Sequence, residues 1–342
     1  MHTAIIREHH NLQPLNTLSV PATARWFTEV ADETGLINAL EFAARQHCPL
    51  WVLGSGSNVV LGEYFPGLVV KMAIAGIEVV RETDDTVHLA VGAGENWHRL
   101  VCECVRRGYH GIENLALIPG TVGAAPIQNI GAYGVELADV FSYLHGIDRI
   151  SGSKHRFDCE DCEFGYRDSI FKHRLQDRMV ITQVGLCLHK QPRWNLSYPA
   201  LRHRLEAYST AALDAQLIAT TVVALRQSKL PDPSAIPNAG SFFTNPLVAE
   251  NSYRRLHRQY PQMVSYPQAN GHHKLAAGWL LDNAGWRGKS IAGVAMHHGQ
   301  ALVLVNPNRR PGIAVLAFAQ SVQADIAAKY DIQLTIEPRL YV

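Results

Sequence analysis

Three glycine-rich segments in the first part of the chain constrain its fold more than any other feature. They are residues 54–58 (Gly-Ser-Gly-Ser-Asn), 92–94 (Gly-Ala-Gly) and 119–126 (Pro-Gly-Thr-Val-Gly-Ala-Ala-Pro). Glycine allows positive φ and lets successive N–H groups line a concave nest, which suits the phosphates of a nucleotide. Each segment alone indicates only a tight turn, but three in one lobe favour a dinucleotide-binding domain.

These segments lack the glycine spacing of the doubly wound dinucleotide-binding fold. The third glycine of that fingerprint is replaced by Val59 after the first segment and by Trp97 after the second. The periodicity around them predicts an α+β fold instead. In the first half we expect helices at 32–46 and 96–107 and strands at 50–53, 68–72, 77–80, 87–91, 143–150 and 179–188.

The second half of the chain has a helix-rich pattern of its own. Residues 229–233 (Lys-Leu-Pro-Asp-Pro) form a stiff, helix-breaking linker, and we expect a hinge near 190–230. The predicted elements are helices at 213–227, near Leu256, at 275–284 and at 313–330, and strands at 301–305 and 332–337. We therefore predict two domains, 1–200 with two lobes divided near residue 72, and 201–342, whose last strand returns to the first lobe.

The charge balance excludes a global attraction to nucleic acid or to an anionic membrane. Lys and Arg total 31 against 30 for Asp and Glu, so the net charge is +1 and any anion-binding site must be local. The N-terminal stretch lacks the apolar core of a signal peptide, and the aliphatic runs are too short to span a bilayer. Six cysteines without a regular framework indicate reduced thiols in a cytoplasmic protein.

A metal site is not predicted. Cys159 and Cys162 have the spacing of a metal knuckle, but no second Cys or His pair follows at the required distance. The adjacent histidine pairs lack the i, i+4 spacing with an acidic partner that helical zinc sites use. We interpret these residues as structural.

Two short motifs contain candidate catalytic residues. In 165–169 (Gly-Tyr-Arg-Asp-Ser), Arg167 either binds an anion or pairs with Asp168 on the surface. In 240–246 (Gly-Ser-Phe-Phe-Thr-Asn-Pro), we expect Ser241 to be shielded by the aromatic residues and to donate a proton. A nucleophile elbow is excluded because Phe243 occupies its second glycine position.

The order of these motifs resembles that of the UDP-N-acetylenolpyruvoylglucosamine reductase family, over residues from about 16 to 340. The motifs that carry the resemblance are 54–58, 92–97, 119–123, 126–134, 165–169 and 240–243. The last two are specific to the family. The glycine segments alone also fit the wider class of flavin oxidoreductases with this FAD-binding fold.

The resemblance implies an FAD-binding domain of the PCMH/VAO type, with two α+β lobes, followed by an α+β substrate-binding domain. The family reduces the enolpyruvyl ether of UDP-N-acetylglucosamine to UDP-N-acetylmuramate for peptidoglycan precursor synthesis, using NADPH and non-covalent FAD. For this chain it implies a cytoplasmic monomer. The implied FAD-binding residues are Gly54, Ser55, Gly56, Ser57, Asn58, Pro119, Gly120, Thr121, Gly123, Ala124, Ala125, Gln128 and Asn129.

The resemblance also implies three catalytic residues. Ser241 is the proton donor, and Arg167 and Glu337 act on the enolpyruvyl carboxylate and the developing enol. Tyr198 resembles the tyrosine that covers bound substrate in the long-loop type of the family. The full set of implied substrate-binding residues is Tyr133, Tyr166, Tyr198, Lys229, Asn245, Tyr266, Arg287 and Gln300.

The sequence departs from the family pattern at two places. Ala124 and Ala125 stand where the family often has serine or glycine, so no side-chain hydroxyl contacts the flavin there. Near the C-terminus, Glu337 occupies the family glutamate in the ungapped register, whereas an adjacent register would place Arg339 there. Without the resemblance, Glu337 on the polar face of a strand would be interpreted as a solvent-exposed residue.

Two other functions fit part of the pattern. A sugar or alcohol oxidase of the same flavin fold commonly binds flavin covalently through His or Cys, and the glycine segments contain neither. A catalytically inactive nucleotide-sugar-binding protein would have no need of Arg167, Ser241 and Glu337 together. Acid-released flavin, covalent flavin and colourless protein would distinguish the three.

Overall fold

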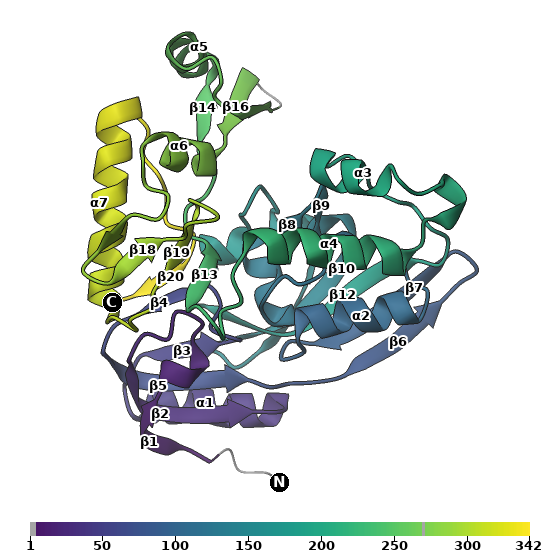
Figure 1. Ribbon diagram of the computed structural model, residues 1–342. Coiled ribbons are helices and arrows are strands. Elements are labelled where there is room, and N and C mark those ends of the chain that lie inside the picture. The colour runs from purple at the N-terminus through teal and green to yellow at the C-terminus, as the bar shows by residue number, and fades with distance from the viewer. Residues whose placement is uncertain (1–4, 269–270) are drawn as a thin grey trace. The chain divides into compact units, whose positions relative to one another are not determined.

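The computed structural model describes residues 5–268 and 271–342, which fold into two compact units (Figure 1). The first unit comprises Met1–His10, Ala24–Ser55 and Pro66–Ser228. The second comprises Asn11–Thr23, Gly56–Phe65 and Lys229–Val342. We expected one boundary at residue 200, but residues 201–228 fold with the first unit and two N-terminal stretches fold with the second.

A five-stranded antiparallel sheet, in the order β11-β10-β12-β7-β6, forms the centre of the first unit. Helices α2 and α4 cover one of its faces (Figure 1), and their apolar side chains share a buried core with the sheet. The elements are β6 (Ile77–Glu82), β7 (Thr86–Gly92), β10 (Phe141–Asp148), β11 (Lys154–Asp158), β12 (Met179–His189), α2 (Trp97–Arg106), α3 (Pro199–Leu205) and α4 (Ala215–Lys229). Helices α2 and α4 and strands β6, β7, β10 and β12 lie within a few residues of their predicted positions, whereas α3 was not predicted.

A four-stranded sheet, in the order β1-β2-β5-β3, forms the second layer of this unit with helix α1. Its elements are β1 (Arg7–Asn11), β2 (Thr23–Val30), β3 (Leu50–Leu53), β5 (Tyr64–Met72) and α1 (Glu33–Arg45). Asp32 caps α1, and its Oδ1 accepts the N–H of Gly35 at 2.7 Å. The buried residues of α1 recur at helical spacing, which turns one face of the helix toward the sheet.

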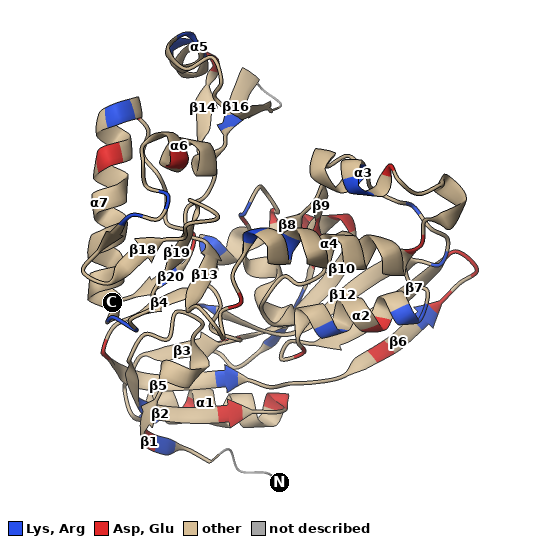
Figure 2. Ribbon diagram, in the orientation of Figure 1, with Lys and Arg blue, Asp and Glu red and all other residues tan. Residues whose placement is uncertain are grey.

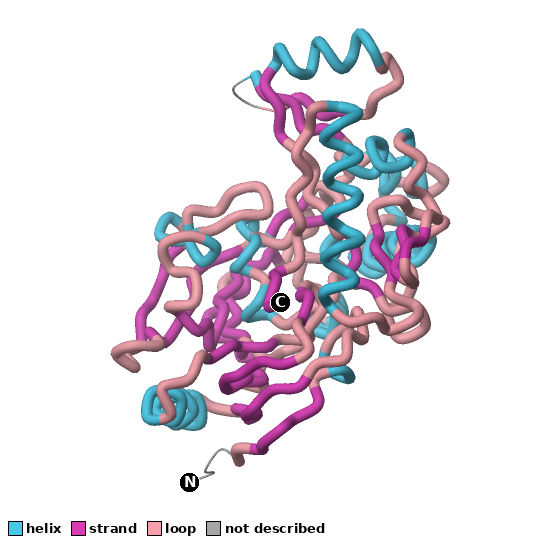
Figure 3. Tube along the Cα trace, turned by 90° about the vertical axis from the view of Figure 1, so that its left-hand side faces the viewer, coloured by secondary structure: helices cyan, strands magenta, loops and turns pink. Residues whose placement is uncertain are grey.

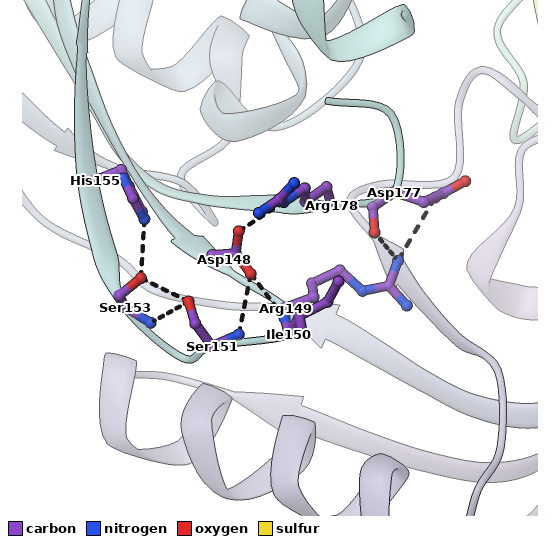
Figure 4. Close-up of polar contacts among 8 residues, drawn as sticks. All are labelled: Asp148, Arg149, Ile150, Ser151, Ser153, His155, Asp177 and Arg178. Carbon is purple, nitrogen blue, oxygen red and sulfur yellow. Dashed lines mark hydrogen bonds and ion pairs between the residues drawn. The ribbon is translucent and has the colours of Figure 1, made fainter. Parts of the chain in front are cut away.

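The turn after β10 is fixed by a buried carboxylate (Figure 4). Asp148, whose side chain is 5% exposed, accepts two backbone N–H groups of the turn and pairs with Arg178 at 2.8 Å. The hydrogen bond from Arg178 and the backbone donors hold the pKa of Asp148 well below its usual range. The neighbouring Arg149 donates to the carbonyl of Leu50 at 2.7 Å, which joins this turn to the start of β3.

The second unit contains several small sheets and one long helix, α7 (Gly312–Tyr330). Its sheets have the orders β13-β19-β18-β17, β14-β16-β15 and β20-β4. The strands are β4 (Val59–Leu61), β13 (Asn238–Ser241), β14 (Leu247–Ala249), β15 (Ser265–Pro267), β16 (His272–Leu275), β17 (Ser290–Ile291), β18 (Val294–Met296), β19 (Val303–Val305) and β20 (Arg339–Tyr341). The helices are α5 (Glu250–Gln259), α6 (Ala277–Asn283) and α7 (Gly312–Tyr330), the last being the long upright helix of Figure 3.

The end of the chain differs from the strand predicted at 332–337. Ile332 and Leu334 are buried, at 5% and 3% exposure, so the alternation in the sequence is real. However, within the described residues the strand pairing of this segment is limited to an isolated bridge between Ile336 and Phe243. The regular strand is β20, which pairs in parallel with β4. The last strand therefore does pair with an N-terminal segment, and that segment belongs to the second unit.

Charged residues of both signs are interspersed along the chain (Figure 2), in keeping with the net charge of +1. Among the described residues, no helix is long and apolar enough to cross a bilayer.

Candidate active site

The glycine-rich segments meet in the first unit. Gly54 follows β3, and a Cβ added to it would lie 2.7 Å from the Thr121 Oγ1 atom. The N–H of Gly123 donates to the carbonyl of Ala93 at 2.8 Å, and a Cβ there would lie 2.5 Å from the Ala93 Cβ. Such close backbone approach requires glycine. The structure thus brings the three segments into one cradle, as a nucleotide-binding function requires.

The remainder of the first glycine segment belongs to the second unit. Gly56 has φ +65°, and a Cβ on it would lie 2.0 Å from the carbonyl oxygen of Leu15. Its own carbonyl accepts the N–H of Thr17 at 3.0 Å. The carbonyl of Asn58 accepts the N–H of Arg339 at 3.0 Å, at the start of the β4–β20 pair. The division between the units therefore falls within the predicted pyrophosphate loop.

The long loop after α2 folds into two short 3-10 helices, η3 (Val122–Ala124) and η4 (Pro126–Gln128). Ala124 is exposed and Ala125 is buried, so only the first of the two alanines is accessible. Gly120 has φ +138°, and its carbonyl accepts the N–H of Trp97 at 3.1 Å. This contact holds the loop against the start of α2.

Asn129 ends the loop in an internal role. It is 1% exposed and has φ +43°. Its Nδ2 donates to Glu136 at 2.8 Å and to the carbonyl of Gly165 at 3.1 Å, and its Oδ1 accepts the N–H of Ala138. Both the nitrogen and the oxygen of the Asn129 side-chain amide are therefore engaged within the protein. The bond to the Gly165 carbonyl positions the turn that precedes Arg167.

Arg167 is half-buried and does not pair with Asp168. Its guanidinium donates to the carbonyls of Asn129 and Gly131, and its backbone has φ +54°. Asp168 instead contacts the Nε2 of His173 at 2.8 Å. The surface-pair alternative is therefore wrong, and the hydrogen bonds of the Arg167 guanidinium go to neutral carbonyls.

A second guanidinium, that of Arg226 on α4, is close enough to Arg167 for the charge of Arg167 to lower the pKa of Arg226. Its Nε is buried without a hydrogen-bond partner in the described part of the chain. Burial is the main cause that lowers the pKa of Arg226; Tyr133 raises it and Arg167 lowers it further. Among the described residues, no ion pair joins either arginine to a carboxylate. We call Arg167, Arg226 and Tyr133 the arginine cluster.

Tyr198 contacts this cluster through Tyr133. The two rings meet edge to face with centroids 4.9 Å apart. Burial raises the pKa of Tyr133. The segment before Tyr198 is held nearby, because Nδ2 of Asn195 donates to the carbonyl of Gly134 at 2.8 Å. Tyr166, also half-buried, has its ring centroid 5.4 Å from the Cζ of Arg167. Of these three predicted substrate-binding tyrosines, Tyr166 lies against Arg167, and Tyr198 reaches the arginine cluster through Tyr133.

Ser241, in the second unit, lies at the end of β13 after Gly240, whose φ is +67°. The shielding predicted for Ser241 is not observed. Phe242 and Phe243 are buried, at 0% and 1% exposure, with their ring centroids 5.4 Å apart, whereas Ser241 is exposed in the chain. Both aromatic rings are buried in the core, whereas the serine that precedes them is not. They anchor the turn rather than cover the hydroxyl.

Glu337 is held next to this turn by backbone pairing. Its N–H donates to the carbonyl of Phe242 at 2.9 Å, and the N–H of Thr244 donates to the carbonyl of Thr335 at 3.0 Å. Arg339 instead begins β20, where it pairs with Val59. This arrangement favours the register that places Glu337, and not Arg339, beside Ser241.

Comparisons with known proteins agree with this arrangement. A family profile described as an FAD binding domain matches residues 25–154, and one described as the C-terminal domain of UDP-N-acetylenolpyruvoylglucosamine reductase matches 232–341. The UDP-N-acetylenolpyruvoylglucosamine reductase of Pseudomonas aeruginosa is 45% identical over 98% of this chain and 99% of its own. The chain belongs to the UDP-N-acetylenolpyruvoylglucosamine reductase family.

Other relatives support membership of the reductase family. The enzyme of the same name from Burkholderia lata is 45% identical over 96% of this chain and 95% of its own. The crystal structure of UDP-N-acetylenolpyruvylglucosamine reductase from Thermus caldophilus has a TM-score of 0.69 and 22% identity, and covers 99% of both chains. That structural likeness confirms the predicted fold, an FAD-binding domain followed by a C-terminal domain of this family.

FAD is the cofactor of this reductase-family chain, and the residues present fit it. A Cβ on Gly54 would collide with Thr121, and a Cβ on Gly123 would collide with Ala93. Because both residues are glycine, the backbone segments of the cradle can lie this close together. A peptide nest of this kind suits a pyrophosphate. The predictions for individual FAD-binding residues remain predictions.

The remaining predicted substrate residues lie in the second unit. Oδ1 of Asn245 accepts the N–H of Ala277 at 2.9 Å, and Gln300 lies near Gly278, so both are at the start of α6. Arg287 forms a forked pair with Asp282, which engages its charge. Tyr266, 43% exposed, lies opposite Lys274 on the next strand, and Lys229 ends α4.

Two residues with a place in the site were missed from the sequence. Arg226 lies three residues before Lys229, so both cations are on the same side of a helix. This spacing was the sequence signal that could have indicated Arg226 as a binding residue. Lys71 donates to the carbonyl of Gly54 from the neighbouring strand β5. No sequence signal indicates Lys71, since the contact depends on which strands pair.

Proposed function

We propose that this chain reduces the enolpyruvyl ether of UDP-N-acetylglucosamine to the lactyl ether of UDP-N-acetylmuramate, with non-covalent FAD and with NADPH as reductant. The observation that carries the proposal is 45% identity to the Pseudomonas aeruginosa reductase along 98% of the chain. The glycine cradle around Gly54 and Gly123 would hold FAD, which would supply hydride transfer from NADPH to the terminal enolpyruvyl carbon. The rest of the chemistry falls to side chains of the protein.

The arginine cluster is suited to the negative charge that the reaction creates. Hydride addition places carbanion character on the carbon next to the substrate carboxylate. Arg167 can hold that carboxylate through two parallel N–H groups, and Arg226 adds a second positive charge to the same region. Burying an unpaired cation costs several kcal/mol. An anionic substrate would remove this cost, which supports the assignment of the cluster to substrate binding.

Ser241 is proposed to donate the proton that completes the reaction at the same carbon. Its exposure leaves the hydroxyl accessible to a substrate, and the buried Phe242 and Phe243 fix the turn that presents it. A serine hydroxyl is a weak acid, so it requires a nearby group to assist proton transfer. Glu337, anchored through its N–H to the Phe242 carbonyl, is the group we assign to this task.

The function is tested by NADPH oxidation with purified protein. We expect the protein to be yellow, to release its flavin on acid denaturation, and to oxidise NADPH rapidly only when the enolpyruvyl nucleotide is added. UDP-N-acetylglucosamine, which lacks the enolpyruvyl group, serves as the matched control and should give no stimulation. Equal NADPH oxidation with both nucleotides would contradict the proposal, and covalently retained flavin would indicate an oxidase instead.

Tyr198 provides a test of substrate covering, the feature of the long-loop type. We expect Tyr198→Ala to weaken binding of the enolpyruvyl nucleotide by more than about tenfold, since it removes an aromatic wall worth about 1.4 kcal/mol or more. FAD content should not change. Tyr198→Phe keeps the ring and its edge-to-face contact with Tyr133 but removes the hydroxyl. It therefore separates the contribution of the ring to substrate binding from that of the hydroxyl. Calorimetric titration makes the measurement, and unchanged affinity in the alanine variant would exclude the covering role.

We further infer that the enzyme acts as a cytoplasmic monomer on small molecules alone. The near-neutral net charge of +1 supports the absence of a nucleic-acid partner. Light scattering on the holoenzyme tests the monomer.

A further inference from the structure

Lys71 is a partly buried cation placed behind the glycine cradle. It ends the parallel pairing of β3 with β5, directly opposite Leu53, and its Nζ donates to the carbonyl of Gly54. Burial is the main cause that lowers the pKa of Lys71, and the charge of Glu29 raises it. Within the described part of the chain, no ion pair joins Lys71 to a carboxylate. The hydrogen-bond acceptor of the Lys71 ammonium group is therefore a backbone carbonyl, that of Gly54.

The hydrogen bond from Lys71 determines how the first peptide of the loop is oriented. The carbonyl of Gly54 and the N–H of Ser55 belong to one peptide group, and the chain has no cis peptide bond among its described residues. In a trans peptide these two groups point in opposite directions. Since Lys71 binds the oxygen, the Ser55 N–H is directed to the opposite side of the loop.

The two possible orientations have opposite effects on a bound anion. An N–H directed at a phosphate attracts it, whereas a carbonyl oxygen carries partial negative charge and repels it. Thr121, whose Oγ1 lies close to the Gly54 Cα, limits the space for any compensating movement of the loop. A cation behind the peptide therefore stabilises the orientation that attracts phosphate.

We propose that Lys71 is a positioning residue of the FAD pyrophosphate site. It holds the Gly54 peptide so that the Ser55 N–H, and not the carbonyl, faces the pyrophosphate. This rests on the assignment of the glycine segment to the pyrophosphate. It predicts a role confined to the diphosphate part of FAD, because the isoalloxazine ring gains nothing from the orientation of this peptide.

The test compares flavins with and without a diphosphate. Apoprotein is titrated with FAD and with riboflavin, and binding is followed by quenching of flavin fluorescence. We expect Lys71→Met to raise the Kd for FAD by more than about tenfold and the Kd for riboflavin by less than about twofold. Lys71→Arg should keep FAD affinity within about threefold of wild type, because a guanidinium donates to the same carbonyl. Lys190→Met, which removes a lysine paired with Glu82, is the matched control.

Three outcomes would overturn the proposal. They are unchanged FAD affinity in Lys71→Met, an equal loss for FAD and riboflavin, and failure of Lys71→Arg to restore binding. If Lys71→Met does not fold, Lys71→Gln is the variant that tests the proposal. The proposal requires that Lys71→Gln bind FAD at least about threefold more weakly than Lys71→Arg and still bind riboflavin. ADP that fails to compete with FAD on wild-type protein would refute the underlying loop assignment, a result distinct from failure of Lys71 alone.

Discussion

Ser241→Ala should retain FAD and its reaction with NADPH but lose more than about 100-fold in formation of the product nucleotide. A positioned general acid contributes at least this much when the proton it supplies is part of the rate-limiting chemistry. NADPH reacts before any proton reaches the substrate carbon, so the first half-reaction should be unaffected. Stopped-flow measurement of the flavin absorbance resolves the two steps, first with NADPH and then with the enolpyruvyl nucleotide.

The environment of Ser241 makes this variant a clean test. The hydroxyl is on an exposed residue, while the neighbouring Phe242 and Phe243 that fix the turn remain in place, so the fold should be unaffected. Ser321→Ala on α7 removes a hydroxyl that binds only the Ala317 carbonyl, and it should behave as wild type in both steps. A variant that slows the NADPH step and leaves the nucleotide step unchanged would refute the role of Ser241.

Arg167→Lys should lower the rate of substrate reduction by more than about tenfold, a loss above about 1.4 kcal/mol in transition-state stabilisation. Lysine keeps the charge but not the planar fork that binds a carboxylate through two parallel hydrogen bonds. It also cannot donate in the same geometry to the carbonyls of Asn129 and Gly131, which now orient the guanidinium. Flavin content and the NADPH step should hardly change.

Single-turnover reaction of reduced enzyme with the enolpyruvyl nucleotide measures this effect. Arg174→Lys is the matched control, since Arg174 is exposed and pairs only with Glu163. It should react at the wild-type rate. Equal rates for wild type and Arg167→Lys would mean that Arg167 only stabilises the loop through its hydrogen bonds to the Asn129 and Gly131 carbonyls. Arg226 alone would then supply the positive charge that binds the substrate carboxylate.

Local patterns in the sequence predicted the helices well because their signals are short-range. Asp32 and Asn96 cap α1 and α2 by side-chain hydrogen bonds, and the buried residues of both helices follow the apolar spacing. Strand β2 was not predicted, since Arg25 and Glu29 interrupt its apolar run. Strand β11 was also missed, because this edge strand of the five-stranded sheet is almost fully exposed.

Features of the candidate site that depend on distant pairing were not available from the sequence. The motifs predicted Arg167 and Ser241, but the spacing of Arg226 and Lys229 on α4 does not reveal that Arg226 lies near Tyr133. The same applies to Lys71, whose contact with Gly54 follows from the parallel register of two strands. The shielding expected for Ser241 failed for a different reason: sequence adjacency to aromatic rings says nothing about which side of the chain the rings face.

The parallel pairing of β4 with β20 has a consequence for how the protein is made. Val59 leaves the ribosome about 280 residues before its partner Arg339, which at bacterial elongation speeds corresponds to roughly 15–60 s. During that interval the second unit has no complete sheet at this position, and for most of it α7, whose first residue Gly312 abuts the Leu61 carbonyl, has not yet been synthesised. Nascent chains arrested before residue 339 should therefore keep residues 56–65 accessible to protease, and a fragment comprising only 229–342 should not fold.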